Sequence, residues 1–339
     1  MEKKKVIIIS TGIVLLICVI ALGLFLGCQP YPAEKKPKLK EEKGPEIIID
    51  KDKIRAYVKI LASENFQGRR AGTEGEAEAA LYLAQELKKM DIRPIGKKNT
   101  YFQPFPLPAT DLKWEGKRLV FYVKDNTSKL VSDNILGLIE SSKRPYQYII
   151  LSAHYDHLGM WKNKLYPGAN DNASGVAAVL EIARFLRTAK ELPYSIIIAF
   201  WGGEEMGLIG SNFFINNPPL NLANIKLAIN LDSIGTGVQN GFLLWNDGPA
   251  EITNRLYLDW SKWDNIKLLS QYTSLNSSDH KAIAQAQIPA ITILADDWLN
   301  GNHTSLDNPV TLNYDKISYL ARHIAQYLNS PEIEKLLDN

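Results

Sequence analysis

Short apolar segments alternate with longer amphipathic segments along the second half of the chain, and this alternation limits the fold more than any other feature. "YQYIILSA", "YSIIIAFW", "IKLAINL" and "IPAITIL" are apolar enough to be strands buried on both faces. Between the first two, "GVAAVLEIARFLRTA" repeats its apolar residues at helical spacing. Buried strands separated by helices predict a single three-layer α/β domain with a mostly parallel central sheet flanked by helices.

Two helices are expected before this alternating region, and each has a recognisable start. Asp50 and Asp52 precede apolar residues at helical spacing over 54–61 and are candidate N-caps. In "TEGE", Thr73 and Glu76 have the spacing of a capping box, in which each side chain accepts a hydrogen bond from the other residue's backbone N–H. The region 97–147 is irregular, with short pieces such as "RLVFYV" that favour strands.

Carboxylates and imidazoles follow the ends of several expected strands. They are His154, Asp156, Glu204, Glu205, Asp232 and His303, with Asp171 close to the start of the helix after the first strand. The carboxyl ends of parallel strands lie at one edge of a sheet, and ligands of open α/β sheets bind beyond that edge. We therefore expect these side chains to converge on one site.

Such a cluster of acidic groups favours a metal centre. Neighbouring carboxylates raise one another's pKa unless a cation lies among them. Histidine nitrogen with carboxylate oxygen, and no cysteine, suits Zn²⁺ in a catalytic site, and Mn²⁺ and Co²⁺ are also compatible. The candidate ligands are more than one tetrahedral ion takes. The sequence therefore predicts two metal ions about 3.5–4 Å apart, bridged by a carboxylate and a water.

Five motifs together resemble the co-catalytic zinc aminopeptidases. This peptidase family includes secreted bacterial leucyl aminopeptidase, glutamate carboxypeptidase and glutaminyl cyclase. The motifs are "HYDHLG", "GANDNASG", "GGEEMGLIGS", "NLDSIG" and a late "HT". "GRRAGTEGE" around Arg69 resembles the family's upstream signature as well. The resemblance covers about residues 54–328 and implies a fold of the zinc aminopeptidase (phosphorylase/hydrolase-like) type.

The resemblance also implies a role for each site residue. Asp171 would bridge two zinc ions. His154 and Glu205 would complete the shell of one ion, and Asp232 and His303 that of the other. Spacing alone does not decide which of the adjacent glutamates is a ligand. The resemblance makes Glu204 the general base.

Several neighbouring residues are expected to support the centre. Asp156 lies two positions after His154 on an extended chain and is expected to hydrogen-bond its ring from behind. Asp279 and His280 in "SSDHKAIAQ" match a family motif and are expected beside the ligands or in the substrate pocket. His157 is expected to be a structural histidine, because the ligand set is already complete.

The sequence does not identify the group that would stabilise the tetrahedral oxyanion. Some relatives use a tyrosine close to the last ligands. In this chain Asn302 precedes His303, and Leu275 stands where another relative supplies the tyrosine. Tyr272 lies near in sequence, but the alignment does not require it.

The N-terminal segment resembles an export signal. A basic start, "MEKKK", is followed by an uncharged apolar run that ends at Cys28. "FLGC" resembles the lipobox of bacterial lipoproteins, whose cysteine is lipidated, although the apolar run is also long enough for an uncleaved anchor helix. Residues 1–28 are thus a lipoprotein leader or membrane anchor, 29–46 a flexible tether and 47–339 the catalytic domain. Both alternatives place that domain outside the cytoplasm, tethered to the membrane.

These observations predict a zinc aminopeptidase that acts on peptides with a free N-terminus. A glutaminyl cyclase, a carboxypeptidase or a dipeptidase on the same fold is the alternative. A binding module without catalysis is disfavoured, because every ligand expected from the family and the base are present. A net charge of +2 with interspersed signs gives no indication of nucleic-acid binding, so no nucleic-acid partner is expected. The sequence identifies no protein partner.

Overall fold

The computed structural model describes residues 48–125, 128–263, 267–271 and 277–338. The leader, the tether, Cys28, Tyr272 and Leu275 lie outside these residues. Across the described part of the chain, every helix is too short or too polar to cross a membrane.

A mixed sheet forms the centre of the domain. Its strand order is β1-β5-β9-β6-β10-β13-β11-β12, with β2 paired to β5. The four central strands, β9, β6, β10 and β13, run parallel to their neighbours in this group. β5 and β11 join the two sides of the group in antiparallel orientation. The expected α/β domain with a mostly parallel sheet is confirmed.

The strands of the main sheet have the following bounds. They are β1 (Arg93–Pro94), β2 (Phe102–Pro106), β5 (Val131–Ile139), β6 (Tyr148–His154), β9 (Ser195–Trp201), β10 (Ile225–Leu231), β11 (Gly241–Asp247), β12 (Lys267–Gln271) and β13 (Ala290–Ala295). The helices are α2 (Lys51–Leu61), α3 (Glu74–Lys89), α4 (Gly175–Thr188), α5 (Ile209–Asn216), α6 (Ala250–Trp260), α7 (His280–Ala284), α8 (Tyr314–Leu328) and α9 (Pro331–Leu337).

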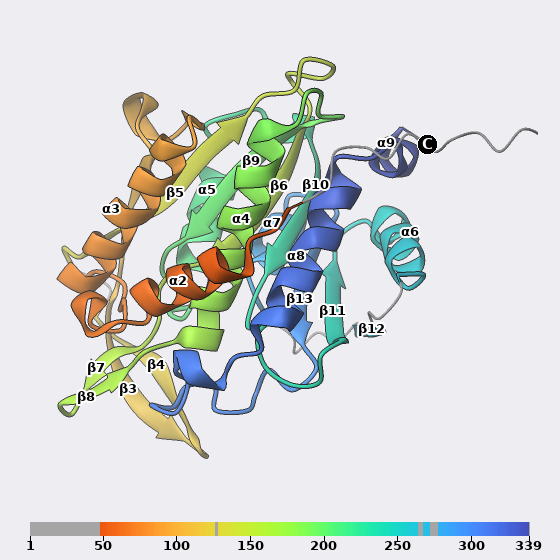
Figure 1. The fold of residues 1–339 in the computed structure, drawn as a ribbon. Helices are drawn as coiled ribbons and strands as arrows, with labels where there is room; N and C mark the ends of the chain where they lie inside the picture. The colour runs from red at the N-terminus through yellow and green to blue at the C-terminus, as the bar shows by residue number, and fades with distance from the viewer. Residues whose placement is uncertain (1–47, 126–127, 264–266, 272–276, 339) are drawn as a thin grey trace, which may run out of the picture. The chain divides into compact units, whose positions relative to one another are not determined.

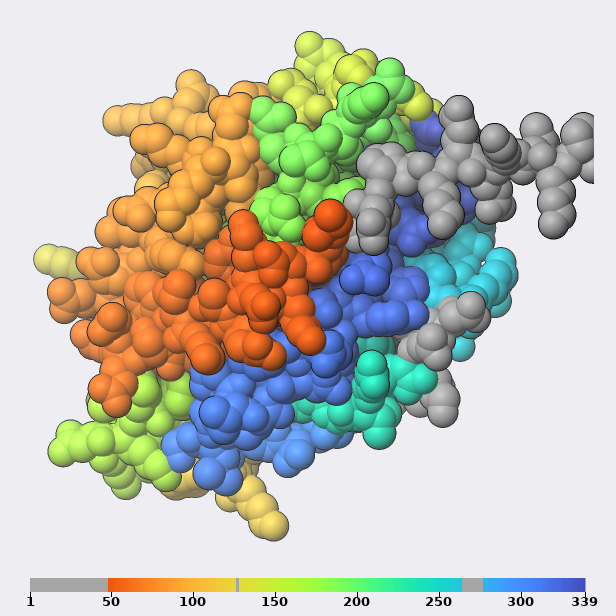
Figure 2. Space-filling model, viewed as in Figure 1, coloured from red at the N-terminus to blue at the C-terminus, as the bar shows by residue number. Residues whose placement is uncertain are grey.

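Helices cover both faces of the sheet (Figure 1). Alternate residues of a strand point to opposite faces, and in β9 Ile196 and Ile198 join one apolar cluster while Ile197 and Ala199 join another. The first cluster also contains side chains from α2, α3, α4 and α8, and the second contains Phe214 of α5 and α7 residues. Side chains of α2, α4 and α8 close over the near face in Figure 2. The central strands are apolar throughout because neither of their faces meets water.

The two expected helix starts differ in outcome. Of the two candidate caps, Asp50 caps α2 and Asp52 lies in its first turn; the carboxylate of Asp50 accepts hydrogen bonds from the backbone N–H of Asp52 and of Lys53. The prediction of a capping box at α3 is wrong. Thr73 instead donates its hydroxyl to the carbonyl of Arg70. Glu76 turns inward, where its carboxylate accepts from the backbone N–H of Gly72 and from the hydroxyl of Ser132.

Two small hairpins lie together at one end of the sheet (Figure 1). One consists of β3 (Ala109–Glu115) and β4 (Arg118–Asp125), and the other of β7 (Gly159–Trp161) and β8 (Lys164–Tyr166). They share a small apolar cluster of Leu112, Leu119, Leu158 and Tyr166. Because β7 follows closely after the end of β6, both hairpins stand at the edge where the carboxyl ends of the central strands emerge.

Candidate metal centre

A cavity at the carboxyl edge of the sheet brings the expected ligands together. His154 is the last residue of β6, Asp232 follows β10, and the two adjacent glutamates follow the turn after β9. The cavity has a volume of about 340 Å³. Its lining includes His154, Asp171, Glu204, Glu205, Asp232 and His303. All are less than a tenth exposed except the two glutamates, which are half-buried as whole residues, although the side chain of Glu205 is only 4% exposed.

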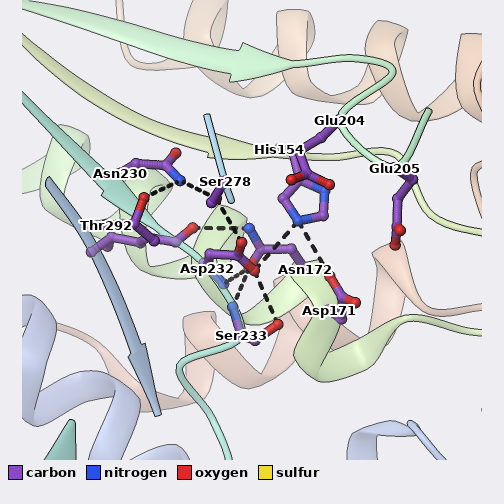
Figure 3. Close-up of polar contacts among 12 residues, drawn as sticks. His154, Asp171, Asn172, Glu204, Glu205, Asn230, Asp232, Ser233, Ser278 and Thr292 are labelled. Atoms are coloured by element: carbon purple, nitrogen blue, oxygen red, sulfur yellow. Dashed lines mark hydrogen bonds and ion pairs between the residues drawn. The ribbon is translucent and has the colours of Figure 1, made fainter. Parts of the chain in front are cut away.

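Three of these residues form a first cluster. Nε2 of His154 lies 3.2 Å from Oδ1 of Asp171 and 3.4 Å from Oδ1 of Asp232. The three side chains converge on one point (Figure 3). Each offers one ligand atom, and these atoms lie within 4.8 Å of one another, which is a suitable spread for the shell of a single ion.

A second cluster lies on the other side of Asp171. Nε2 of His303 lies 2.9 Å from Oε2 of Glu205 and 3.3 Å from Oδ2 of Asp171. Asp171 therefore presents Oδ1 to the first cluster and Oδ2 to the second. A carboxylate in this position has the geometry of a bridge between two ions.

The grouping of ligands differs from the one that the resemblance implied. His154 was expected with Glu205, and Asp232 with His303. The structure instead places His154 with Asp232 and Glu205 with His303. The reason lies in the sheet. β6 and β10 are neighbours, so the residues at their ends meet directly. Glu205 comes after the Gly202–Gly203 turn, which carries it away from the strand and toward the loop of His303.

His157, expected to be a structural histidine and not a ligand, lies directly against the ligands. Its Nδ1 lies 2.8 Å from Oε1 of Glu205, and the residue is fully buried. Together with Asp171 and Glu205 it forms a further group with the spread of a metal shell. Its Nε2 has no hydrogen-bond partner among the described residues. The signal in the sequence was its place three residues after His154 in the same motif.

Asp156 supports the centre mainly through the turn after β9. Its carboxylate accepts hydrogen bonds from the backbone N–H of Glu204 at 3.1 Å and of Glu205 at 3.4 Å. The expected contact with the ring of His154 is longer, at 3.7 Å between Nδ1 and Oδ1, and the backbone carbonyl of Asp156 lies nearer, at 3.3 Å. One buried carboxylate thus fixes the direction of both glutamates.

Glu204 and Glu205 have opposite electrostatic environments. Burial raises the pKa of Glu204 well above its usual range, and the charges of Asp279, Asp232 and Glu205 act in the same direction. Burial also raises the pKa of Glu205, but the charge of His303 and hydrogen bonds from His157 and His303 outweigh it and lower the pKa to about 2. Glu205 is held by two imidazoles. The carboxylate of Glu204 lines the cavity and makes no hydrogen bond or ion pair with the described residues.

The loop that carries Asp171 is held by residues that the sequence did not indicate. The carboxylate of Asp307 accepts hydrogen bonds from the backbone N–H of Asn170 at 2.6 Å and of Asp171 at 3.0 Å. The amide of Asn302 donates to Oδ2 of Asp171 at 2.5 Å. Both residues flank His303 in sequence, so only their proximity to that ligand pointed to them.

A chain of buried hydrogen bonds supports Asp232 (Figure 3). The hydroxyl of Ser278 donates to Oδ2 of Asp232 at 2.7 Å, and the amide of Asn230 donates to Ser278 and to Thr292. Thr292 contacts Nδ1 of His280 at 2.8 Å. His280 therefore acts on Asp232 through this chain, and it does not line the cavity.

Asp279 is fully buried close to Glu204. Neither of its carboxylate oxygens has a hydrogen-bond partner of good geometry among the described residues. Burial raises its pKa to about 7. Like His280, Asp279 is not among the described residues that line the cavity, and its charge raises the pKa of Glu204.

Arg69 ties together the segments on either side of the centre. Its fully buried guanidinium donates to the carbonyls of Tyr155 at 2.7 Å, Pro167 at 2.9 Å, Gly168 at 2.8 Å and Leu61 at 2.5 Å. Burial lowers its pKa to about 10. Tyr155 follows a candidate ligand directly, and Gly168 comes shortly before Asp171. Arg69 is thus the residue of the upstream motif that contacts the segments carrying the candidate ligands.

The ligand atoms fit a zinc centre. They are imidazole nitrogen and carboxylate oxygen, the set that Zn²⁺ takes in catalytic sites. Burial opposes the charged form of His303, yet Glu205 and Asp171 raise its pKa well above the usual range. A field that favours positive charge so strongly inside a buried cluster suits a divalent cation. Fold and site together define an α/β protein with a cluster of histidines and carboxylates that could hold metal at the carboxyl edge of its sheet.

Comparison with known proteins gives the family. The sequence model of peptidase family M28 matches residues 134–328. The chain belongs to peptidase family M28, and the resemblance seen in its motifs is confirmed.

The individual relatives share less than a third of their residues with this chain in the matched regions. Aminopeptidase YwaD of Bacillus subtilis is 29% identical over 205 residues, which are 56% of this chain and 43% of that protein. A probable zinc metalloprotease of Leptosphaeria maculans is 27% identical over 216 residues, 61% of this chain and 45% of that protein. The matched part of the chain thus spans less than half the length of these relatives.

Solved structures share the fold. BSAP, a zinc aminopeptidase from Bacillus subtilis, superposes with a TM-score of 0.66 at 18% identity, over 83% of this chain and 94% of that one. LapA of Legionella pneumophila gives 0.61 at 20% identity, over 83% of this chain and 74% of that one.

Proposed function

We propose that the protein is a zinc-dependent aminopeptidase that removes residues from the free N-terminus of peptides. The observation that carries the proposal is the contrast between the two glutamates. Glu205 is held by imidazoles in the ligand cluster, whereas the carboxylate of Glu204 faces the cavity with no partner among the described residues. The family, and relatives named as aminopeptidases, support exopeptidase chemistry.

Two zinc ions would be held by the two clusters. The residues of the first are His154, Asp171 and Asp232, and those of the second are Asp171, Glu205 and His303. When bound, zinc polarises a carbonyl oxygen and lowers the pKa of water.

Glu204 is the general base in this proposal. Its carboxylate takes a proton from the attacking water and passes it to the nitrogen of the leaving amine. A general base works best when its pKa lies near the working pH, and the upward shift of the Glu204 pKa acts in that direction. Asp156 fixes the backbone of Glu204 through its N–H, which keeps the carboxylate directed at the cavity.

Product analysis tests this proposal against its alternatives. The full-length, zinc-loaded protein is incubated with short peptides whose N-termini are either free or acetylated, and the products are identified by mass spectrometry. Stepwise loss of residues from free N-termini alone is the expected result. Cleavage that ignores the acetyl group would indicate a carboxypeptidase. Loss of ammonia from N-terminal glutamine would indicate a cyclase. A sample treated with a chelator controls for contaminating peptidases that need no metal.

The protein is proposed to act outside the cytoplasm, tethered by its N-terminal segment. The support is the basic start and the apolar run that ends at Cys28. Radiolabelled palmitate and cell fractionation test it in wild type and Cys28→Ala. A lipoprotein loses the label in the variant, whereas an uncleaved anchor keeps both forms in the membrane without label. Recovery of the wild type in the cytoplasm would contradict both.

A further inference from the structure

One side chain in the cavity has no place in the chemistry described so far. Arg118 lines the same cavity as the candidate metal ligands. Among the described residues, no other arginine and no lysine lines this cavity. It is half-buried, its Nε is buried without a hydrogen-bond partner, and it makes no ion pair with the described part of the chain. Most buried or half-buried guanidinium groups in proteins have an anionic or carbonyl partner, so the partner here is open to a ligand.

The hairpin that carries Arg118 is fixed to the metal centre. Arg118 is the first residue of β4, and the carbonyl of the next residue, Leu119, accepts a hydrogen bond from Nδ1 of His303 at 2.7 Å. The side chain of Leu119 is buried in the apolar cluster between the two hairpins. The position of Arg118 relative to the ligands is therefore set by the fold and not by a free loop.

An aromatic wall holds the guanidinium in the cavity. The Arg118 Cζ lies 5.5 Å from the centroid of the Trp298 ring, within the range of a cation–π contact. Trp298 meets Trp245 edge to face, with 5.4 Å between ring centroids, and both rings line the cavity. The contact with Trp298 uses the flat face of the guanidinium. The N–H groups at the edge of the guanidinium stay available to donate hydrogen bonds to a ligand.

We propose that Arg118 is a specificity-determining residue that binds a carboxylate group of the substrate. This inference rests on the proposed peptidase function and deepens it. A guanidinium binds a carboxylate with two parallel N–H···O bonds. The remaining charged groups of the cavity are the metal ligands and Glu204, so Arg118 is the group there that attracts an anion.

Two parts of a peptide supply such a carboxylate. One is the side chain of an N-terminal glutamate or aspartate, and the other is the C-terminal carboxylate of a dipeptide. Two substrate pairs distinguish them. Glutamyl- and glutaminyl-p-nitroanilide differ in the side chain alone, and leucyl-glycine and its C-terminal amide differ in the terminal carboxylate alone.

Arg118→Gln is the test variant, and Lys117→Gln is its control. Lys117 is the neighbouring residue in the same hairpin, is exposed and does not line the metal cavity, and its substitution removes the same charge. We expect Arg118→Gln to lower kcat/KM for the carboxylate member of one pair by about 10- to 150-fold, mostly through KM, because a charge-assisted hydrogen-bond pair is lost. The uncharged member should change by less than about threefold.

Arg118→Lys should recover part of the loss, because lysine keeps the charge without the bidentate geometry. Lys117→Gln should leave both ratios unchanged. If Arg118→Gln lowers the rate for both members of each pair equally, or for neither, the inference is wrong.

A binding measurement separates this inference from the proposed function. Free glutamate, glutamine, leucyl-glycine and its amide are titrated against the zinc-loaded protein, with tryptophan fluorescence as the readout because Trp298 lies against Arg118. Weaker binding of one carboxylate ligand to Arg118→Gln than to wild type supports the inference even in a protein that hydrolyses no peptide. Active wild type with no preference for a carboxylate in any of these measurements overturns the inference and leaves the peptidase proposal intact.

Discussion

Asp307 holds the backbone of Asp171. Its carboxylate accepts a hydrogen bond from the N–H of Asp171 at 3.0 Å and a second from the N–H of the preceding residue, Asn170. The candidate bridging ligand therefore receives its position from an acidic residue that lies outside every recognised motif.

Replacing this acid is expected to weaken metal binding. Asp307→Asn keeps the shape of the side chain but loses the charged acceptor that faces two N–H groups. Removal of such outer contacts commonly lowers metal affinity by about 10- to 100-fold. Competition with a chromophoric chelator measures the zinc affinity. The control is Asp315→Asn, whose side chain is 64% exposed and pairs with Lys51 on the surface. An unchanged affinity in Asp307→Asn would show that the loop keeps its shape without this contact.

The two adjacent glutamates are expected to respond differently to the same substitution. Glu204→Gln removes a carboxylate that makes no hydrogen bond or ion pair with the candidate metal ligands. Bound zinc should therefore stay at the wild-type level while kcat falls by about 10²- to 10⁴-fold. Glu205→Gln removes the partner of His303 and His157 and should lower the zinc content itself. Metal analysis of the purified variants and their rates on one peptide decide between the roles. Zinc loss in Glu204→Gln with full retention in Glu205→Gln would reverse them.

Glu76 is expected to make the stability of the fold depend on pH. Burial raises its pKa from 4.5 to about 8 in the folded protein. The folded state thus binds this proton more tightly than the unfolded chain, so the contribution to the free energy of unfolding is complete below about pH 4.5 and is lost as pH rises to about 8.

Glu76→Gln isolates this effect, because glutamine copies the neutral acid and keeps contacts to Gly72 and Ser132. Across that pH window the free energy of unfolding should fall by about 1 to 3 kcal/mol more in wild type than in the variant. Denaturant titrations at several pH values, with zinc in excess, measure the difference. Parallel pH profiles would contradict the assignment.

Arg69 is expected to be essential for stability. Its guanidinium serves four backbone carbonyls, and lysine cannot reach all of them from one point charge. Each buried carbonyl left without a donor costs about 1 to 3 kcal/mol, so Arg69→Lys should lower the free energy of unfolding by at least about 3 kcal/mol. Thermal and urea unfolding measure it. Arg93→Lys is the control, because Arg93 is exposed and its pair with Glu140 contributes little.

The sequence was sufficient to predict the sheet and the position of the site. A strand that is apolar throughout, such as β9, predicts burial on both faces. Because the central strands are parallel, the residues that follow each of them lie at one edge of the sheet. Helix starts were less certain. Asp50 caps α2 as expected, but Glu76 found a buried partner in Ser132, a contact across 56 positions that no local pattern encodes.

The arrangement of the ligands needed the structure. Which histidine meets which carboxylate depends on the turn after β9 and on the loop of His303, and neither has a regular periodicity. The contacts of His157 with Glu205 and of Asp307 with Asp171 could not be predicted for the same reason, since they span 48 and 136 positions of the chain. Arg118 lies in an irregular region, where nothing in the sequence shows that a hairpin will reach the cavity.

The hydrogen bond from His303 to Leu119 uses a backbone carbonyl, across 184 positions of the chain. Any residue at position 119 offers the same oxygen, but only an apolar side chain there keeps the hairpin on its buried cluster. A single inserted residue in β4 would instead turn every following side chain to the opposite face and move the carbonyl out of register. The hairpin should therefore tolerate substitutions at its exposed positions and not a change in strand length.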